Sequence, residues 1–336
     1  MVANYEGEII VNKLSRILAI ASAAALIAGS LSGCGAGKSR MMFGTGGTAG
    51  TYYSYGGVIA QYMTNYADVK VTAVSTGGSK VNIQSIEDGD FQLGFTQSDV
   101  MAYAWSGTKS FEQDGPTHDF RVLGGLYAET VQLITMEDDI NSVEDLKGRS
   151  VSIGQAGSGV YFNAIDVLEA AGITVDDIKP QYQSFEDSKE SLKDGKIDAA
   201  FIVAGAPTTA ITELATTNGV RLINIDGALR DEILAEDPYY APLEIPADTY
   251  PGQTDPVETI TVKATVVVDA DVDDETAYKL TAAIFDHKDD IARENAKGAE
   301  LSLENATEGM AAPFHPGAAK YYKEHGVSVE TDENAF

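Results

Sequence analysis

The chain has 336 residues with 51 acidic and 23 basic side chains, so its formal net charge at pH 7 is −28. A polyanion of this kind is repelled by nucleic acid and gains nothing from an anionic lipid surface, which excludes both as partners recognised through charge. Hydrophobic residues make up 44 % of the chain and prolines number only 10, which is typical of a globular protein.

The N-terminal segment has the order of a bacterial secretory signal. Lys13 and Arg16 precede an apolar stretch, and the sequence Leu-Ser-Gly-Cys follows it and ends at Cys34. Charged, apolar and small residues in this order are typical of a signal peptide, and the ending is similar to the lipobox of bacterial lipoproteins. We therefore predict a signal peptide over 1–33, lipidation of Cys34, a lipid-anchored tether over 34–40 and an extracytoplasmic location at the cell membrane. The alternative is a cytosolic protein with an apolar N-terminus and a buried cysteine.

The first half of the remaining chain alternates between strands and helices. A strand leads into the loop FGTGGTAGTYYSYGG (43–57), which opens a helix near 53–65. A second strand is expected over 69–76, a short helix begins at 77–79, and a buried strand runs over 91–96 and ends at Gln97. Apolar sequence typical of a strand is then found over 121–137, and a second region of the chain starts near there.

The second region repeats the pattern. Ser142 to Asp145 has the residues of a capped helix start, and VSIGQAGSGVYFNA (151–164) again leads from a strand through a glycine loop into a helix. A helix over 189–194 and a strand over 197–203 follow. This alternation predicts an α/β protein with parallel sheets and crossover helices.

The C-terminal part is less regular. Residues 238–256 are rich in Pro, Tyr and Asp and predict a long loop. A strand is expected over 259–268, one amphipathic helix over 274–295, and another short helix within 313–327. No repeat of solenoid length is present in the sequence.

The two glycine loops, at 43–57 and 151–164, are the strongest functional signal. Each puts bare backbone N–H groups at the positive end of a helix, which suits an anion. Glycine also lets a ligand approach a backbone that has no Cβ. Two such loops about a hundred residues apart predict two lobes that close on one small anionic ligand. Because the net charge of −28 opposes such a ligand, local amides and hydroxyls would have to capture it.

Motifs for catalysis are weak by comparison. Gly44 to Ala49 nearly matches a dinucleotide fingerprint, but the partner strand ends in Ser75 and Thr76 where that motif needs an acid. No serine lies in a GxSxG elbow, no two histidines have metal-ligand spacing, and the single cysteine excludes an intrachain disulfide and a Cys-based metal site. We predict no catalytic residue, no metal site and no cofactor, and therefore no enzyme.

Neutral polar side chains follow the predicted strands and suit a small polar ligand in a cleft. They are Thr45, Thr48, Thr51, Tyr52, Ser75, Thr76, Ser79, Gln97, Ser98 and Ser158. Some of these could instead cap helices, and Tyr52 could be a core aromatic residue. No arginine lies in these loops to clamp a carboxylate, although Arg121 or Arg149 could reach in from a neighbouring strand end.

A set of motifs occurs in order along the chain and resembles one family. The motifs are FGTGGTAGTYY, STGGS, FTQSD, LYAE, DLKGRSVSIGQAGSG, LKDGKIDAAFIVAGAP, TYPG and HPGAAKYYKEHG. Together they are similar to the TAXI family of TRAP-transporter solute receptors, from about Met41 to Gly326. Two positions depart from the usual pattern: Val160 stands where threonine is common, and Ala128 where proline is common. The hydroxyl missing at Val160 favours a less polar ligand.

The resemblance implies a type II periplasmic-binding-protein fold with two α/β lobes joined by hinge strands. Lobe I would comprise 41–132 plus 250–336, and lobe II 133–249. The ligand would be a small carboxylate, such as glutamate, glutamine or a 2-oxoglutarate-like dicarboxylate. The receptor, expected to be a monomer, would deliver it to the TRAP permease membrane subunits. The alternatives left open are a ligand-sensing lipoprotein that regulates a signalling partner and a secreted enzyme with a substrate cleft.

Ligand contacts carried over by motif, or added to them from the strand ends, come from both lobes. Those of lobe I are Gly46, Gly47, Thr48, Tyr52, Ser75, Ser79, Gln97 and Ser98. Those of lobe II are Gly157, Ser158, Gly159, Val160, Ala204 and Gly205.

Overall fold

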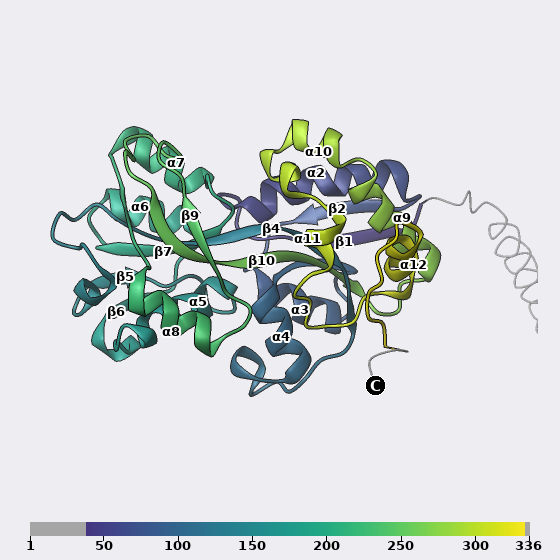
Figure 1. Cartoon of the computed structure of the whole chain (residues 1–336), viewed down its shortest axis with the longest axis horizontal. Helices are drawn as coiled ribbons and strands as arrows, with labels where there is room; N and C mark the ends of the chain where they lie inside the picture. Colours follow the sequence, from purple (N-terminus) through teal and green to yellow (C-terminus); the bar gives the residue numbers. More distant parts are fainter. Residues whose placement is uncertain (1–37, 333–336) are drawn as a thin grey trace, which may run out of the picture. The chain divides into compact units, whose positions relative to one another are not determined.

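Two long strands, β4 (Phe120–Thr135) and β10 (Val257–Asp269), run antiparallel through the centre of the protein (Figure 1). The computed structural model describes residues 38–332. The predicted signal peptide, Cys34 and most of the predicted tether lie outside these residues. Within them, no helix is both long and apolar enough to cross a membrane.

The strands form a ten-stranded sheet in the order β2-β1-β3-β10-β4-β7-β5-β6, with β8 paired to β4 and β9 to β10. The others are β1 (Arg40–Gly44), β2 (Lys70–Val74), β3 (Leu93–Gln97), β5 (Ser150–Ser152), β6 (Lys179–Gln181), β7 (Ala199–Ala204), β8 (Arg221–Ile223) and β9 (Ala241–Ile245). The α/β class is confirmed. The strands β1, β2 and β3 pair in parallel, as do β5, β6 and β7, whereas β4 and β10 pair antiparallel with their neighbours.

Helices cover both faces of the sheet (Figure 1). The α-helices are α2 (Thr51–Tyr66), α3 (Ser79–Glu87), α4 (Ser98–Ser106), α5 (Gly159–Ala170), α6 (Phe185–Lys193), α7 (Thr209–Thr217), α8 (Gly227–Glu236), α9 (Asp274–Phe285), α10 (Lys288–Glu294), α11 (Leu303–Thr307) and α12 (Pro316–Glu324). The 3₁₀ helices are η1 (Lys109–Phe111), η2 (Val143–Leu146), η3 (Val175–Asp177) and η4 (Ala296–Glu300).

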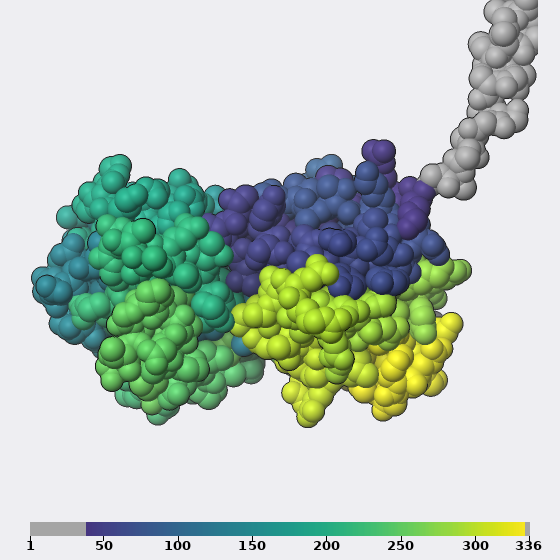
Figure 2. All heavy atoms as spheres, turned by 90° about the horizontal axis from the view of Figure 1, so that it is seen from above, coloured from purple at the N-terminus to yellow at the C-terminus, as the bar shows by residue number. Residues whose placement is uncertain are grey.

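The sheet carries separate hydrophobic cores, which define two lobes. The core of lobe I includes Phe43 and Phe95, whose rings stack with centroids 4.9 Å apart. The cores of lobe II lie on the two faces around β7, with Phe201 in one and Ile202 in the other. Full burial of one such side chain contributes about 1.5–3 kcal/mol. Figure 2 shows lobe II, in teal and green, beside lobe I, in purple, blue and yellow.

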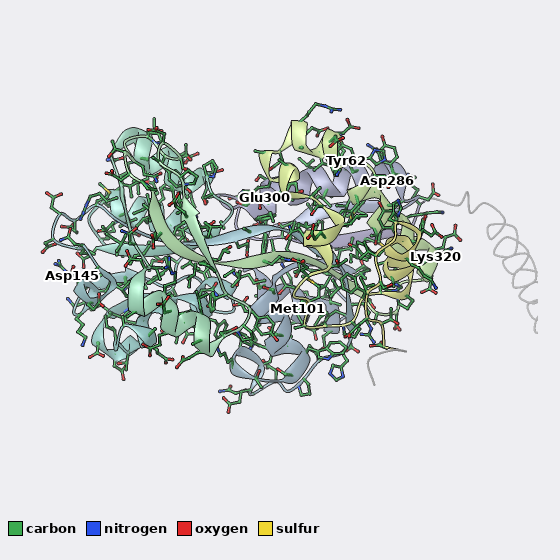
Figure 3. The ribbon with its side chains drawn as sticks, viewed as in Figure 1. Tyr62, Met101, Asp145, Asp286, Glu300 and Lys320 are labelled. Atoms are coloured by element: carbon green, nitrogen blue, oxygen red, sulfur yellow. The ribbon has the colours of Figure 1, made fainter. Side chains whose placement is uncertain are left out.

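The predicted helix start at Ser142 is confirmed as a capping box, although it opens the short 3₁₀ helix η2. The Asp145 carboxylate accepts hydrogen bonds from the backbone N–H groups of Asn141, at 2.8 Å, and Ser142, at 3.0 Å. These backbone hydrogen bonds lower the pKa of Asp145. Figure 3 labels Asp145 at the outer end of lobe II.

Two predictions in the C-terminal part are wrong. The expected loop over 238–256 contains β9, which pairs with the first half of β10 and places Pro242 on an edge strand, where proline is tolerated. The expected single helix over 274–295 breaks between α9 and α10. At the break, His287 stacks on Tyr66 with ring centroids 3.7 Å apart, so the two short helices follow the surface of α2.

The contact between α9 and α12 depends on Gly317. A Cβ at this position would overlap the Asp274 carbonyl oxygen and lie 2.8 Å from the Tyr278 nitrogen. We expect Gly317→Ala to lower the free energy of unfolding by about 1–3 kcal/mol, because the overlap can only be relieved by moving one helix. Gly57→Ala is the matched control, since a Cβ there meets nothing within 4 Å. Urea denaturation of both variants checks the prediction, and equal midpoints would contradict it.

Candidate ligand-binding site

The N-termini of four helices meet at one cavity between the lobes. The N-cap residues of α2, α3, α5 and α6 are Gly50, Gly78, Ser158 and Ser184, and all four line the cavity. These helices follow the parallel strands β1, β2, β5 and β6, so the cavity lies at the carboxyl ends of strands from both lobes, where α/β sheets bind ligands. Each helix end contributes free N–H groups and a partial positive charge.

The cavity holds about 520 Å³ of space between atoms, its open mouth included. Nine of the fourteen predicted contact residues line it: Gly46, Gly47, Tyr52, Ser79, Gln97, Ser158, Gly159, Val160 and Ala204. The other lining residues are not among the fourteen, although Thr51 is one of the polar side chains noted after the predicted strands: Gly50, Thr51, Gly77, Gly78, Glu129, Gln155, Gln183, Ser184, Phe185 and Val203.

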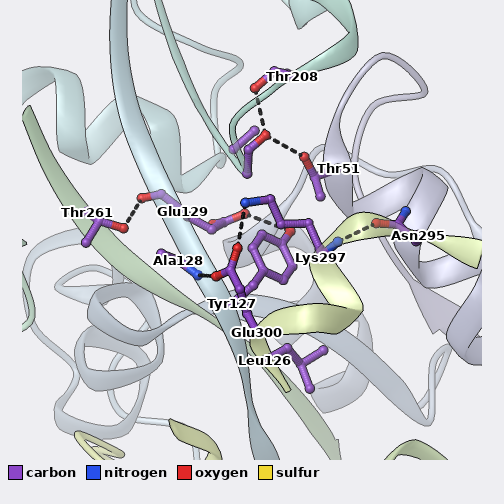
Figure 4. A network of polar contacts seen from close by, with 12 residues as sticks. Thr51, Leu126, Tyr127, Ala128, Glu129, Thr208, Thr261, Asn295, Lys297 and Glu300 are labelled. Carbon is purple, nitrogen blue, oxygen red and sulfur yellow. Dashed lines mark hydrogen bonds and ion pairs between the residues drawn. The ribbon is translucent and has the colours of Figure 1, made fainter. Parts of the chain in front are cut away.

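The other five predicted residues lie around this cavity without lining it. Thr48 and Ser75 line an adjoining hollow, and Gly157 lines another. The buried Ser98 hydroxyl accepts a hydrogen bond from the Lys263 backbone, at 3.1 Å. The Gly205 carbonyl accepts hydrogen bonds from two threonine hydroxyls, as Figure 4 shows. For all fourteen residues, contact with a ligand stays a prediction.

The four helix ends differ in how they are capped. The Ser158 hydroxyl accepts a hydrogen bond from Tyr161 N at 3.3 Å, and that of Ser184 from Asp187 N at 3.1 Å. Gly50 and Gly78 provide no side-chain cap. The first-turn N–H groups of α2 and α3, both in lobe I, are therefore not satisfied by a capping side chain and are the better placed for an anion.

Among the described residues that line the cavity, Glu129 is the only one with a carboxyl, amino or guanidinium group in its side chain. Its exposed fraction is 2 %. The Tyr52 hydroxyl donates to Oε2 at 2.9 Å, and the Tyr127 hydroxyl to Oε1 at 3.3 Å. Burial, aided by the Asp99 charge and opposed by the hydrogen bond from Tyr52, raises the pKa of the Glu129 carboxyl to about 8.

The arginines considered from the sequence do not enter the cavity. The Arg121 Nε donates to Asp332 at 2.7 Å, and the Arg149 guanidinium to Asp139 at 2.6 Å. Neither arginine lines the cavity. A bidentate arginine clamp is therefore absent from the part of the site that the structure describes.

A buried hydrogen-bond network joins the lobes beside the cavity. Asn163 of α5 accepts from Gln97 Nε2 at 3.0 Å and donates to Asp99 Oδ2 at 2.9 Å. It also donates to the Tyr240 hydroxyl at 2.7 Å. Gln97 and Asp99 belong to lobe I, so a single lobe II side chain connects to two residues across the interface.

An ion-pair cluster extends this network toward the surface. Lys109 Nζ lies 3.3 Å from an Asp166 carboxylate oxygen and 3.2 Å from one of Asp237. The Tyr103 hydroxyl donates to the same Asp237 oxygen at 2.5 Å. The structure thus holds the lobes in contact through both neutral and charged groups.

Solved structures share this fold at low identity. A protein of Bordetella bronchiseptica RB50 is 16 % identical, with 85 % of this chain and 89 % of that one covered and a TM-score of 0.53. The binding-protein component of an ABC phosphonate transporter from Pseudomonas aeruginosa is 12 % identical, with 79 % and 80 % covered and a TM-score of 0.53. The periplasmic aliphatic sulphonate binding protein from Escherichia coli is 18 % identical, with 85 % and 90 % covered and a TM-score of 0.45.

These likenesses concern the fold alone. The predicted type II periplasmic-binding-protein fold, with two lobes, is confirmed. The profile of one family, described as NMT1-like, matches residues 43–326, which is most of the chain. The chain therefore belongs to the NMT1-like family.

Proposed function

We propose that the chain is an extracytoplasmic solute-binding receptor of a TRAP-type secondary transporter and not an enzyme. It would capture a small carboxylate, such as glutamate, glutamine or a 2-oxoglutarate-like compound, and deliver it to the membrane permease. The observation that carries this proposal is the meeting of four helix N-termini at one cavity between two lobes. The phosphonate-transporter component with the same fold is a binding protein, which supports the general class.

The assignment to a TRAP system rests on the ordered motifs between residues 41 and 326. The phosphonate-binding neighbour serves an ABC transporter, so the permease type needs its own test. Uptake by cells that express the chain with its permease should stop when the ion gradient is collapsed and persist when ATP is depleted. Lipidation of Cys34 and removal of residues 1–33 are part of the same proposal.

A carboxylate suits the lobe I side of the cavity. The uncapped N-termini of α2 and α3 present backbone N–H groups there, and these need no cationic side chain to hold an anion. Such fixed dipoles act in a site shielded from water, where the charge of −28 on the whole protein is less important than local contacts.

Capture would couple to lobe closure. A ligand that touches both lobes favours the form in which they meet, in proportion to its extra affinity for that form. The strands β4 and β10 pass through both lobes and would act as the hinge. The lobe limits at 132 and 250 remain part of this proposal; Tyr250 and Val257 pack in a lobe II core.

A thermal-shift panel on residues 35–336 without lipid tests the function. The panel contains amino acids, C4–C6 dicarboxylates, 2-oxoacids and short monocarboxylates. A ligand at 100 times its Kd adds about 2.7 kcal/mol of stability. A selective rise in melting temperature with one carboxylate class supports the proposal. No rise with any compound, after refolding to remove copurified ligand, would contradict it.

Variants in the two glycine loops test whether the ligand bridges the lobes. A Cβ at Gly47 meets nothing within 4 Å, so Gly47→Val should fold and place its side chain in the cavity. We expect about a tenfold loss of affinity, since about 1.4 kcal/mol of contact is lost. Ser158→Ala removes the cap of α5 and should also weaken binding. Calorimetric titration measures both; full affinity in both variants would refute bridging.

A further inference from the structure

We propose that the ligand carries a protonated amine and that Glu129 binds it, so that the cargo is a small zwitterionic amino acid and not a dicarboxylate. This inference rests on the proposed function, because it places the ligand carboxylate at the helix N-termini of the same cavity. It adds that Glu129, through its contact with the positively charged amine, determines which carboxylate ligands bind.

Glu129 is a buried carboxyl group without a cationic partner in the described part of the chain. Glu129 lies in the middle of β4 with 2 % of its surface exposed, and it lines the cavity. Within residues 40–332, no lysine or arginine forms an ion pair with it. Two tyrosine hydroxyls donate to it, one to each oxygen. The nearby Gln97 side chain also lowers the pKa of this carboxyl. A carboxylate accepts about four hydrogen bonds, so acceptor capacity remains.

The nearby lysine, Lys297, already forms an ion pair with another acid. Lys297 of η4 packs against Gly205 and lies over the Tyr127 ring, but its Nζ pairs with Glu300 at 2.7 Å (Figure 4). The other Glu300 oxygen accepts from the Ala128 backbone at 2.8 Å. Lys297 therefore neutralises Glu300, and Glu129 is left for a ligand. A buried carboxylate without a counter-charge is costly, and a ligand ammonium removes that cost.

A second acceptor lies on the same cavity wall. Gln97 Oε1 is buried against Gly159 and has no hydrogen-bond partner among the described residues. The amide orientation follows from Asn163, whose Nδ2 donates to Asp99 and whose Oδ1 accepts from Gln97 Nε2. An acceptor and a carboxylate that need donors match an ammonium, which has three N–H groups and no lone pair.

The two ends of the cavity then select a zwitterion. The ends of α2 and α3 offer donors to a carboxylate, and Glu129 offers acceptors to an ammonium. A 2-oxo acid has the same carbon skeleton as its amino acid but brings only acceptors to Glu129. A dicarboxylate would place a second negative charge in a cavity whose described lining has no cation, and like charges at close range disfavour ionisation of both.

The pH dependence of binding separates the two ligand classes. The pKa of Glu129 is raised to about 8, so the carboxyl is largely protonated at pH 6 and must lose its proton to pair with an ammonium. Amino-acid affinity should therefore rise with pH up to about 8, by at most about tenfold per unit. A diacid that binds the protonated form would show the opposite slope.

Other titratable groups face Glu129 from neighbouring elements. Burial raises the pKa values of Tyr52 and Tyr127 well above their ordinary range, so both stay neutral across this window. The pKa of Asp99 is raised to about 7, also by burial, so its ionisation weakens lobe contact as pH rises toward 7 and opposes the rise in affinity due to Glu129. Asp99→Asn therefore serves as a control that removes this second titration and should leave the slope due to Glu129.

The experiment compares wild type with Glu129→Gln by calorimetric titration at pH 6.0 to 8.5. The probes are matched pairs of glutamate and 2-oxoglutarate, alanine and pyruvate, and leucine and 4-methyl-2-oxopentanoate, with butylamine as an amine that lacks a carboxylate. We expect wild type to favour the amino acid of one pair, and Glu129→Gln to lose about 30-fold or more of that affinity. The pH slope should vanish in Glu129→Gln. Glu169→Gln, at an exposed position of α5, is the matched control and should keep the preference.

The outcomes separate this inference from the proposed function. Tight binding of a 2-oxo acid, or an unchanged preference in Glu129→Gln, overturns the role of Glu129 and leaves carboxylate capture intact. Binding of butylamine without any carboxylate probe supports Glu129 and overturns carboxylate capture. Binding of no probe by refolded, ligand-free protein overturns both.

Discussion

Replacing Gly159 with alanine is expected to reduce ligand affinity by about 100-fold while the protein still folds. Gly159 is the first residue of α5 in lobe II, and a Cβ there would overlap the Gln97 side-chain oxygen of lobe I. Gln97 has little freedom to move, because it is 2 % exposed and its amide donates to Asn163. The lobes must then separate, or Gln97 must abandon that hydrogen bond. A cost of about 3 kcal/mol, within the range for overpacking, corresponds to about 100-fold.

Two measurements distinguish lobe separation from unfolding. Small-angle X-ray scattering should give a larger radius of gyration for Gly159→Ala than for wild type, and urea denaturation should give a nearly unchanged midpoint. Gly57→Ala, on the exposed side of α2, is the control and should change neither affinity nor radius. If Gly159→Ala bound ligand as tightly as wild type, the contact between Gln97 and Gly159 would have no part in closure.

The glycine loops could be found from the sequence because their signals are local. A strand, a run of glycine and hydroxyl residues and a helix are contiguous at 43–57 and at 151–164, and both loops line the cavity. The start of α3 is also predicted at 77–79, whereas the start of α6 is less visible. Ser184 lies in an ordinary loop, and only the parallel pairing of β5 with β6 brings it to the cavity.

Glu129 could not be found in the same way. It stands in LYAE, a motif whose visible departure is Ala128, and the surrounding strand is buried on both faces. One acid in such a strand shows neither what faces it nor whether a cation lies near. Its environment comes from Tyr52 of α2, 77 residues away in the chain, and from Lys297 of η4, which pairs with another acid. Asn163 is similar: in sequence it is one polar residue of a helix with apolar spacing.

The network around Asn163 leads to the second large expected effect. Asn163→Leu keeps a similar volume but removes every hydrogen bond of this side chain. With the lobes in contact, Gln97 Nε2 and Asp99 Oδ2 would lose their Asn163 partner away from water, and each such loss costs about 1–3 kcal/mol. Both groups are hydrated when the lobes separate. We therefore expect the population of the form with separated lobes to rise and ligand affinity to fall by about 100-fold.

The loss in Asn163→Leu should grow with pH. Burial between the lobes raises the pKa of Asp99 from an ordinary 3.8 to about 7, so the contact form binds a proton that the separated form releases. Contact is thus favoured at low pH and weakened as pH rises toward 7. The hydrogen bond from Asn163 lowers the pKa of Asp99. Removing this bond therefore raises the pKa, and the weakening of lobe contact then continues above pH 7. Titration calorimetry at pH 5 and pH 8 should show the larger loss at pH 8, whereas Asn218→Leu, at the exposed end of α7, should show none. An equal loss at both pH values would mean that Asp99 stays in one protonation state while the lobes close.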